Sequence, residues 1–155
     1  MKQTDFQSLI LRIVEQAMQL KDMFTDQKAA RVHYACVFSQ SDEEYDDLMN
    51  TIGLIGKVLE ETSTGNVYQI EPMETVAGPL RIVKIRKYDP TRQELGDADF
   101  AAIGYAEFKA RYLGKPGFKL IEREDFEMIE IMDPSFDARV YFSNPPVEEQ
   151  FNLKR

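Results

Sequence analysis

The basic residues of one predicted strand offer the clearest chemistry in this sequence. Residues 80–88 carry Arg81, Lys84, Arg86 and Lys87. Because side chains alternate along a strand, Lys84 and Arg86 share one face. Such a face can hold a small anion, since an Arg guanidinium suits bidentate recognition of a carboxylate or phosphate. The alternative is a solvated basic strand that pairs with the chain's surplus of acidic side chains.

The motifs of the common enzyme classes are missing. His33 is the only histidine, so a Ser/His/Asp triad would have to use it. The sequence has no Gly-rich phosphate loop, no Cys-rich metal spacing and no Gly-x-Ser-x-Gly elbow. Cys36 is the only cysteine, which excludes an intramolecular disulfide, and in its apolar segment the thiol packs as a small hydrophobe.

The composition of the chain limits the kinds of partner that the protein can bind. The 155 residues are 43% hydrophobic and 30% charged, as in one soluble globular domain. Phosphate backbones repel a net charge of −8, so nucleic-acid binding is disfavoured. No apolar run approaches the roughly 20 residues of a membrane helix, and residues 1–6 lack the apolar core of a signal peptide. We therefore expect a cytoplasmic protein with neither a membrane nor a nucleic-acid partner; its oligomeric state stays open.

The first half predicts a helix followed by a unit of one strand, one helix and three further strands. Residues 5–22 have apolar side chains at helical spacing, which face the domain's own core or, less often, a partner. Residues 31–38 predict an interior strand. In a capping box Ser41 begins the next helix and Glu44 reaches back, and this helix ends near Gly53. Three more strands follow over residues 57–61, 67–70 and 80–88.

The same order of elements recurs in the second half. A strand over residues 97–103 precedes a helix that begins at Gly104 and ends at Gly114. Three strands follow over residues 118–123, 126–131 and 137–143. The two first strands begin about 65 residues apart, which suits two copies of one supersecondary unit. The sequence therefore predicts an α+β fold of two tandem βαβββ units with an extra N-terminal helix.

The predicted domain limits follow from these elements. One domain spans residues 1–146, with unit one over residues 31–90 and unit two over residues 97–143. Residues 147–155 are largely polar and charged and predict a loose C-terminal tail. Paired units of this shape usually face each other across a cleft that holds a ligand.

Short strings within these elements resemble the vicinal oxygen chelate superfamily, the glyoxalase/dioxygenase fold. After the N-terminal helix, Val-His-Tyr-Ala-Cys-Val and Ser-Asp-Glu-Glu-Tyr are similar to the opening of its YecM-like branch, where a strand carrying Asp-His-Ile precedes a helix beginning Glu-Glu-Tyr. Residues 97–101 match a segment where the family often has His-x-Glu-Phe, and residues 136–142 resemble its final strand. The resemblance spans residues 5 to about 146.

The resemblance implies a divalent metal, held by side chains from the first and fourth strands of each unit. His33 falls on the family's His position, and Asp97 or Asp99 falls in the second unit's first strand. Glu130, on a third strand, is the remaining donor, so the implied ligands are His33, Asp99 and Glu130. The two fourth strands offer Lys, Arg and Tyr where a cation needs a carboxylate or His, which leaves the metal site incomplete.

The family arrangement also predicts which side chains face the cleft. In the first strand these are His33, Ala35 and Val37, whereas the residues expected to pack under the helix are Tyr34, Cys36 and Phe38. In the second unit, Asp99 and Ala101 are expected inside the cleft, and Phe100 and Ala102 against the helix.

Two functions of different classes follow. The first is a glyoxalase-fold protein that binds a small polar or anionic molecule on Lys84 and Arg86, with Arg139 and Tyr141 from the second unit completing the pocket. The second is a metal-dependent lyase, isomerase or dioxygenase, in which Glu130 is a ligand or a base. A structural role, with the cleft filled by apolar side chains, is also open. No catalytic residue is assigned, and a divalent metal is the one cofactor implied.

Overall fold

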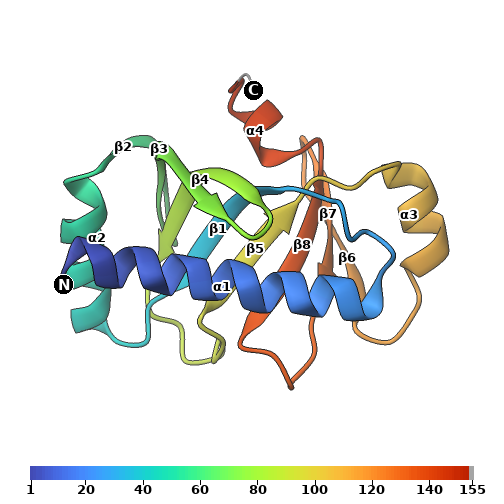
Figure 1. Cartoon of the computed structure of the whole chain (residues 1–155), viewed down its shortest axis with the longest axis horizontal. Coiled ribbons are helices and arrows are strands. Elements are labelled where there is room, and N and C mark those ends of the chain that lie inside the picture. The colour runs from blue at the N-terminus through green and yellow to red at the C-terminus, as the bar shows by residue number, and fades with distance from the viewer. Residues whose placement is uncertain (154–155) are drawn as a thin grey trace.

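A single mixed β-sheet organises the protein. The computed structural model describes residues 1–153, in which the strands lie in the order β2-β3-β4-β1-β5-β8-β7-β6. The strands are β1 (Val32–Phe38), β2 (Gly56–Thr62), β3 (Gly65–Thr75), β4 (Gly78–Arg86), β5 (Gly96–Phe100), β6 (Phe118–Glu122), β7 (Glu127–Ile131) and β8 (Ala138–Asn144). The helices are α1 (Gln3–Phe24), α2 (Asp42–Gly53), α3 (Tyr105–Tyr112) and α4 (Val147–Gln150). Helix α1 crosses one face of the sheet, while α2 and α3 lie at its two ends (Figure 1).

The sheet consists of two equivalent halves. In the first, β1 pairs in parallel with β4, which continues antiparallel to β3 and β2. In the second, β5 pairs in parallel with β8, which continues antiparallel to β7 and β6. The first strands β1 and β5 pair antiparallel with each other at the centre. This topology confirms the predicted α+β fold, with two βαβββ units in the glyoxalase/dioxygenase-like arrangement and an added N-terminal helix.

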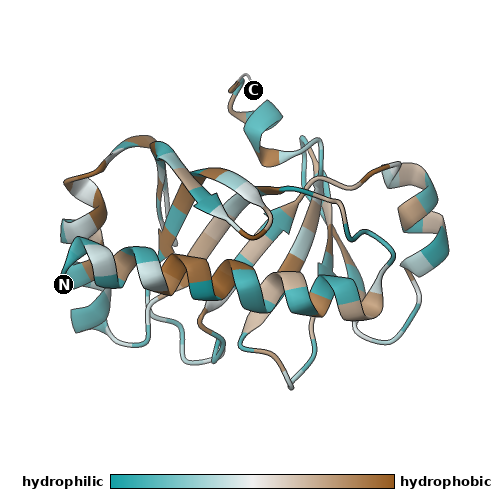
Figure 2. Cartoon of the chain, in the orientation of Figure 1, coloured by the Kyte–Doolittle hydropathy of each residue, from teal (hydrophilic) through white to brown (hydrophobic). Residues whose placement is uncertain are grey.

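Helix α1 supplies one side of the main core. Its fully buried stripe lies against β1, β5 and β8 and consists of Phe6, Ile10, Ile13, Val14, Ala17 and Leu20. Figure 2 shows hydrophobic residues along this helix and along the central strands behind it. The burial confirms that the stripe faces the protein's own core. No helix within residues 1–153 is long and apolar enough to span a membrane.

A bulge in β1 reverses the predicted faces of that strand. The register between β1 and β5 shifts between Val32 and Tyr34, and a bulge inserts one residue and so changes which side chains point to a given face. Ala35 and Val37 therefore join the core under α1, and the prediction that they face the cleft is wrong.

The neighbouring side chains of β1 point to the other face of the sheet. Tyr34 and Cys36 line a pocket there, and Phe38 lies against the guanidinium groups of Arg92 and Arg139. Placing these three residues under the helix was therefore wrong as well. In the second unit the faces agree with expectation, with Asp99 on the pocket wall and Phe100 in the core.

The C-terminal segment is also more ordered than its composition indicates. Residues 147–150 form the short helix α4, in which Val147 and Glu148 are buried. Val147 packs with Tyr34 and Ile82 in a second apolar cluster, on the sheet face opposite α1. The prediction of a loose tail is therefore wrong for this helix; residues 154–155 lie outside the described part of the chain.

Gly96, at the start of β5, lies where the two units approach each other closely. A Cβ added at Gly96 would lie 2.0 Å from the Cys36 carbonyl oxygen, a backbone atom of β1, and 2.9 Å from Ile13 Cδ1. Gly96→Ala should therefore lower the free energy of unfolding by about 1–3 kcal/mol, because the central pair of strands must separate. Urea denaturation measures this loss.

The matched control is Gly53→Ala at the end of α2. A Cβ there would meet nothing within 4 Å, and Ala is favoured over Gly in a helix by about 0.5–1 kcal/mol. Equal stability changes in the two variants would contradict the close-approach explanation.

Candidate functional site

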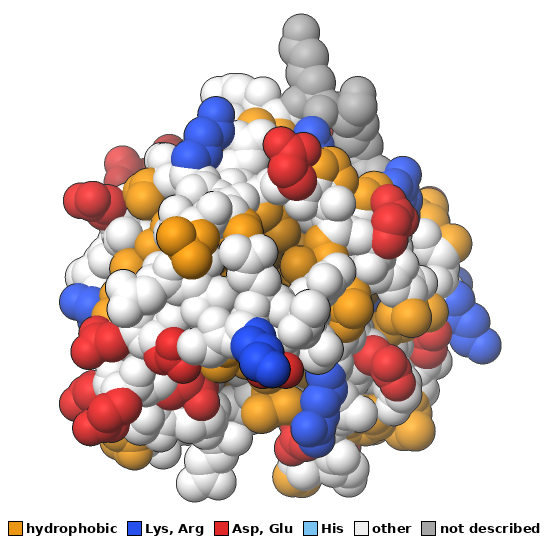
Figure 3. Space-filling view, turned by 60° about the vertical axis from the view of Figure 1, so that its left-hand side comes forward, with side chains coloured by type: hydrophobic (Ala, Val, Ile, Leu, Met, Phe, Trp, Pro, Cys, Tyr) orange, Lys and Arg blue, Asp and Glu red, His pale blue; other side chains and the backbone are white. Residues whose placement is uncertain are grey.

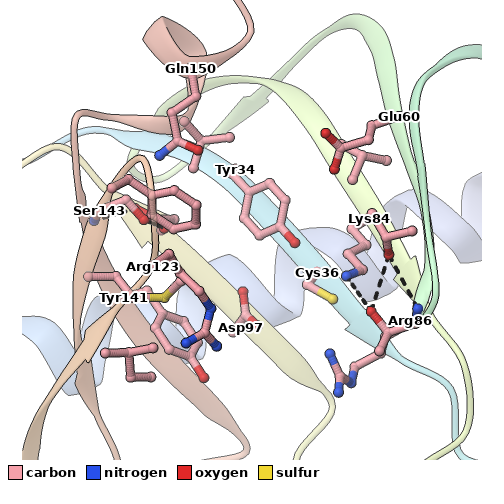
Figure 4. Close-up of a pocket in the computed structure, with 18 of the residues that line it drawn as sticks. Tyr34, Cys36, Glu60, Lys84, Arg86, Asp97, Arg123, Tyr141, Ser143 and Gln150 are labelled. Atoms are coloured by element: carbon pink, nitrogen blue, oxygen red, sulfur yellow. Dashed lines mark hydrogen bonds between the residues drawn. The ribbon is translucent and has the colours of Figure 1, made fainter.

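A pocket of about 800 Å³ lies on the sheet face opposite α1. Both units contribute its walls (Figure 4). Unit one provides Tyr34, Cys36, Lys84 and Arg86, and unit two provides Asp97, Asp99, Tyr141 and Ser143. Helix α4 closes one side through Val147 and Gln150. The pocket is therefore the cleft between paired units that the sequence predicts.

Strand register arranges the polar side chains in rows across the sheet. One row runs from Lys84 on β4 through Cys36 on β1 to Asp97 on β5. A second row, one step along the strands, runs from Tyr34 through Asp99 to Tyr141. Because residues paired in register project from the same face, each row points into the pocket. The positions of these groups are fixed by backbone pairing rather than by loops.

The basic end of the pocket lacks close acidic partners. Lys84 Nζ donates a hydrogen bond to Thr64 Oγ1 at 2.7 Å, and within residues 1–153 no carboxylate oxygen lies within 4.0 Å of it. Burial lowers the pKa of Lys84, and the neighbouring Arg86 lowers it further. Arg86 Nη2 reaches Asp89 Oδ2 only at 4.0 Å, and its buried Nε has no hydrogen-bond partner among the described residues. Lys84 and Arg86 thus present positive charge to the pocket.

The acidic pair on β5 differs in its hydrogen bonds. Asp99 accepts hydrogen bonds from the backbone N–H of Ser143 at 3.0 Å and from the Ser143 hydroxyl. Asp97 is 6% exposed, and its Oδ1 has no partner within the described chain. Burial raises the pKa of Asp99 to about 6, against the lowering effect of the Ser143 hydrogen bonds. Burial and the Asp99 carboxylate raise the pKa of Asp97 to about 8, so Asp97 is largely protonated at neutral pH.

His33 binds helix α4 instead of lining the pocket. Its Nδ1 lies 2.9 Å from Glu148 Oε1. Arg81 of β4 donates from Nε to Glu148 Oε2 at 2.7 Å and contacts the same oxygen through Nη2. The buried carboxylate of Glu148 therefore joins both central strands of unit one to the helix that closes the pocket.

Arg139 interacts with Tyr141 but does not line the main pocket. Its guanidinium forms a bidentate pair with Glu94, through Nε at 2.7 Å and Nη2 at 3.2 Å, and its Nη1 lies 3.6 Å from Glu130. It lines a different cavity, of about 450 Å³, together with Glu94. Tyr141 lies on the main pocket wall, where its hydroxyl donates to Glu130 Oε2 at 2.5 Å. Lys84, Arg86 and Tyr141 thus share one pocket, and Arg139 does not line it.

The three residues implied as metal ligands do not converge. His33 is held by Glu148, Asp99 by Ser143, and Glu130 by Tyr141 and Arg139. Within residues 1–153 no group of three or more His, Cys, Asp or Glu side chains is arranged to hold a metal ion. The pocket side of the fourth strand in unit one carries positive charge, which repels a cation. The residues present do not fit the metal site that the fold family implies.

Several pocket residues were not predicted from the sequence. Arg92 and Arg123 reach the pocket from segments between strands, for which alternation makes no prediction. Tyr34 and Cys36 were assigned to the opposite face because the bulge in β1 has no clear signature in the sequence. Asp97 was named only as an alternative to Asp99. Its two-residue spacing from Asp99 was the signal that both side chains share a face.

The comparison with solved structures supports the fold through one of them. No protein-family model and no curated protein matches the chain. Among solved structures, a structural-genomics protein designated EC4020 superposes with a TM-score of 0.72 at 14% identity, covering 98% of this chain and 92% of that one. A glyoxalase/bleomycin resistance protein/dioxygenase superfamily member from Vibrio splendidus 12B01 gives a TM-score of 0.44 at 9% identity, covering 74% of this chain and 97% of that one. At these identities the likeness concerns fold alone.

The link between Glu148 and the central strands generates a stability prediction. Glu148→Ala leaves half-buried Arg81 and buried His33 without their carboxylate, so we expect the unfolding free energy to fall by about 3 kcal/mol. Amide hydrogen exchange of residues 147–151 should accelerate, because α4 then loses its main polar contact. Glu149→Ala, at the exposed neighbouring position, should change stability by no more than about 0.5 kcal/mol. Equal exchange rates in both variants would contradict this role of Glu148.

The buried state of Asp97 predicts a pH dependence of stability. Between pH 4 and 8 the folded protein keeps a proton on Asp97 that the unfolded chain, with an ordinary pKa of 3.8, has released. This group therefore lowers the unfolding free energy as pH rises through that window, and its effect is constant above it. Asp97→Asn stays neutral throughout, so its stability relative to the parent should rise from pH 5 to 8 and then level off.

Urea denaturation at pH 5, 6.5, 8 and 9 measures this difference. Asp125→Asn, at an exposed acid on the pocket rim, is the control and should follow the parent at every pH. A constant difference between Asp97→Asn and the parent across the series would show that Asp97 has the same pKa in the folded and unfolded states.

Proposed function

We propose that this protein binds a small organic anion in the pocket between its two units, with Lys84 and Arg86 as the charged contacts. The observation that carries this proposal is the unbalanced positive charge at one end of the pocket. Cations withdrawn from solvent are usually paired, yet half-buried Lys84 has a neutral hydroxyl as its partner and half-buried Arg86 reaches its carboxylate only at 4.0 Å. A ligand carboxylate or phosphate would complete both sets of contacts.

The charge distribution favours a small ligand over a macromolecule. The whole chain carries a net charge of −8, which repels large polyanions. On the face seen in Figure 3, Lys and Arg side chains are separated by acidic and neutral ones rather than gathered into a patch. The positive charge of Lys84 and Arg86 lies inside a concave pocket, where low-dielectric walls focus the field on a ligand that fits. The volume of about 800 Å³ falls within the range of small-molecule sites, about 300–1,000 Å³.

Tyr141 contributes a wall rather than a charge. Its hydroxyl is occupied by Glu130, so its ring offers an apolar surface to the carbon skeleton of the ligand. Arg139 acts on the pocket through its neighbours, because its guanidinium holds Glu94 and Glu130 outside the main cavity. The proposed contacts with the anion are therefore Lys84 and Arg86.

We also propose a place for the chain within the glyoxalase/dioxygenase superfamily, in its YecM-like branch. The supporting features are the strings at residues 32–37 and 41–45 and the helix that precedes the first unit. The resemblance implies metal ligands on the first and fourth strands, but here the basic side chain of Lys84 faces the pocket from the fourth strand of unit one. The proposal is therefore of binding, without a metal-dependent step.

The test is removal of both positive charges. Charge-assisted contacts contribute about 1.5–3 kcal/mol each, so Lys84→Met with Arg86→Met should weaken anion affinity about a hundredfold or more. Titration calorimetry with phosphate, citrate and 2-oxo acids measures the affinity. The control, Lys57→Met with Lys87→Met, makes the same change of charge at exposed positions and should bind as the parent does.

Two results would overturn the proposal. The first is a parent that binds none of these anions at millimolar concentration. The second is an equal loss of affinity in the control, which would show that net charge rather than the pocket determines binding. Urea denaturation of each variant confirms that the compared proteins are folded.

A further inference from the structure

The pocket has a second polar end, formed by Asp97. In the row across the sheet, Asp97 is separated from Lys84 only by Cys36. Figure 4 shows Asp97 on the strand beside that of Cys36, with Lys84 and Arg86 on the far side of Cys36. The side chain of Asp97 is 6% exposed and lines the same cavity as the two basic residues. A ligand held by Lys84 and Arg86 therefore extends towards this carboxyl group.

The side chains around Asp97 have other hydrogen-bond partners. Asp99 receives both of its hydrogen bonds from Ser143, and the Tyr141 hydroxyl donates to Glu130. Cys36 Sγ has a long contact, 3.8 Å to the Val37 carbonyl oxygen, and a side-chain hydrogen bond with Tyr34. Oδ1 of Asp97 has no partner within residues 1–153. Because buried polar groups are nearly always hydrogen-bonded, the Asp97 carboxyl group, which lines the pocket, marks a contact point for a ligand.

The chemistry of a carboxyl group limits which ligand group can lie there. A second carboxylate would meet Asp97 as a like charge whenever Asp97 is ionised. A carbonyl oxygen only accepts hydrogen bonds, so it fits only the protonated acid. A hydroxyl group both donates and accepts, and it therefore pairs with Asp97 in either protonation state.

We propose that the ligand of this pocket is a hydroxy acid, whose anionic group contacts Lys84 and Arg86 and whose hydroxyl group contacts the Asp97 carboxyl group. This inference rests on the proposed anion-binding function and adds the second functional group of the ligand. Proteins discriminate strongly against a ligand that lacks such a hydroxyl group, because a buried polar group of the site then stays unpaired and binding is weaker.

A matched series of four-carbon acids tests the hydroxyl contact. Butyrate supplies the anion alone, and 2-, 3- and 4-hydroxybutyrate place a hydroxyl at increasing distance from the carboxylate. Calorimetry on the parent should show at least one hydroxybutyrate binding about tenfold more tightly than butyrate. In Asp97→Ala this ratio should fall to about one while butyrate still binds. In Lys84→Met/Arg86→Met all four acids should weaken together.

Two further variants separate the hydroxyl contact from general effects on the pocket. Asp97→Asn keeps groups that donate and accept hydrogen bonds, so it should retain most of the preference and also serves if the Ala variant is unfolded. Asp125→Ala, at the exposed rim, should retain all of it.

The outcomes distinguish the two proposals. If the parent binds none of the four acids and none of the simpler anions, anion binding itself fails. If butyrate and all three hydroxybutyrates bind the parent equally well, only the hydroxy-acid inference is overturned. A preference that persists in Asp97→Ala would also overturn it, since another residue would then recognise the hydroxyl.

Discussion

The antiparallel pairing of β1 with β5 is the contact on which both faces of the sheet depend. It joins two βαβββ units into one continuous sheet, so that a single long helix, α1, can cover one face of both. The same pairing places Cys36 beside Asp97 and Tyr34 beside Asp99 on the opposite face. The strands approach so closely at Gly96 that no side chain fits between them and α1. Packing on one face and the pocket on the other thus have a common origin.

The pocket contains basic and acidic side chains that do not form salt bridges with one another. Lys84, Arg86, Asp97 and Asp99 all line one cavity, but no salt bridge connects either basic residue to either acid. Asp97 holds its proton near neutral pH, and Asp99 accepts its hydrogen bonds from Ser143 rather than from either basic residue. Outside the pocket wall, Arg139 and Glu148 form compact ion pairs with their neighbours. The ion pairs stabilise the frame of the site and leave the pocket groups available to a ligand.

The sequence predicted the architecture because its signals are local. Apolar spacing in α1, the capping box at Ser41 and alternation in the strands each depend on a few neighbouring residues, and together they define the repeated unit. Lys84 and Arg86 were correctly placed on one face because β4 is regular around them. The faces of β1 were reversed because its bulge arises from pairing with β5, about 60 residues away. The partners of Glu148 and the burial of Asp97 likewise depend on contacts that only the folded chain creates.

Helix α4 follows the last strand of unit two but makes its contacts with unit one. Through Glu148 it holds His33 of β1 and Arg81 of β4, and through Val147 it packs on Tyr34 and Ile82. Helix α4 therefore crosses back over the β1–β5 pairing and links the two halves. The two halves cannot separate without breaking these contacts of α4 as well as the β1–β5 pairing. We therefore expect the repeated units to unfold together as one cooperative unit, in contrast to repeat proteins whose modules gain and lose structure step by step.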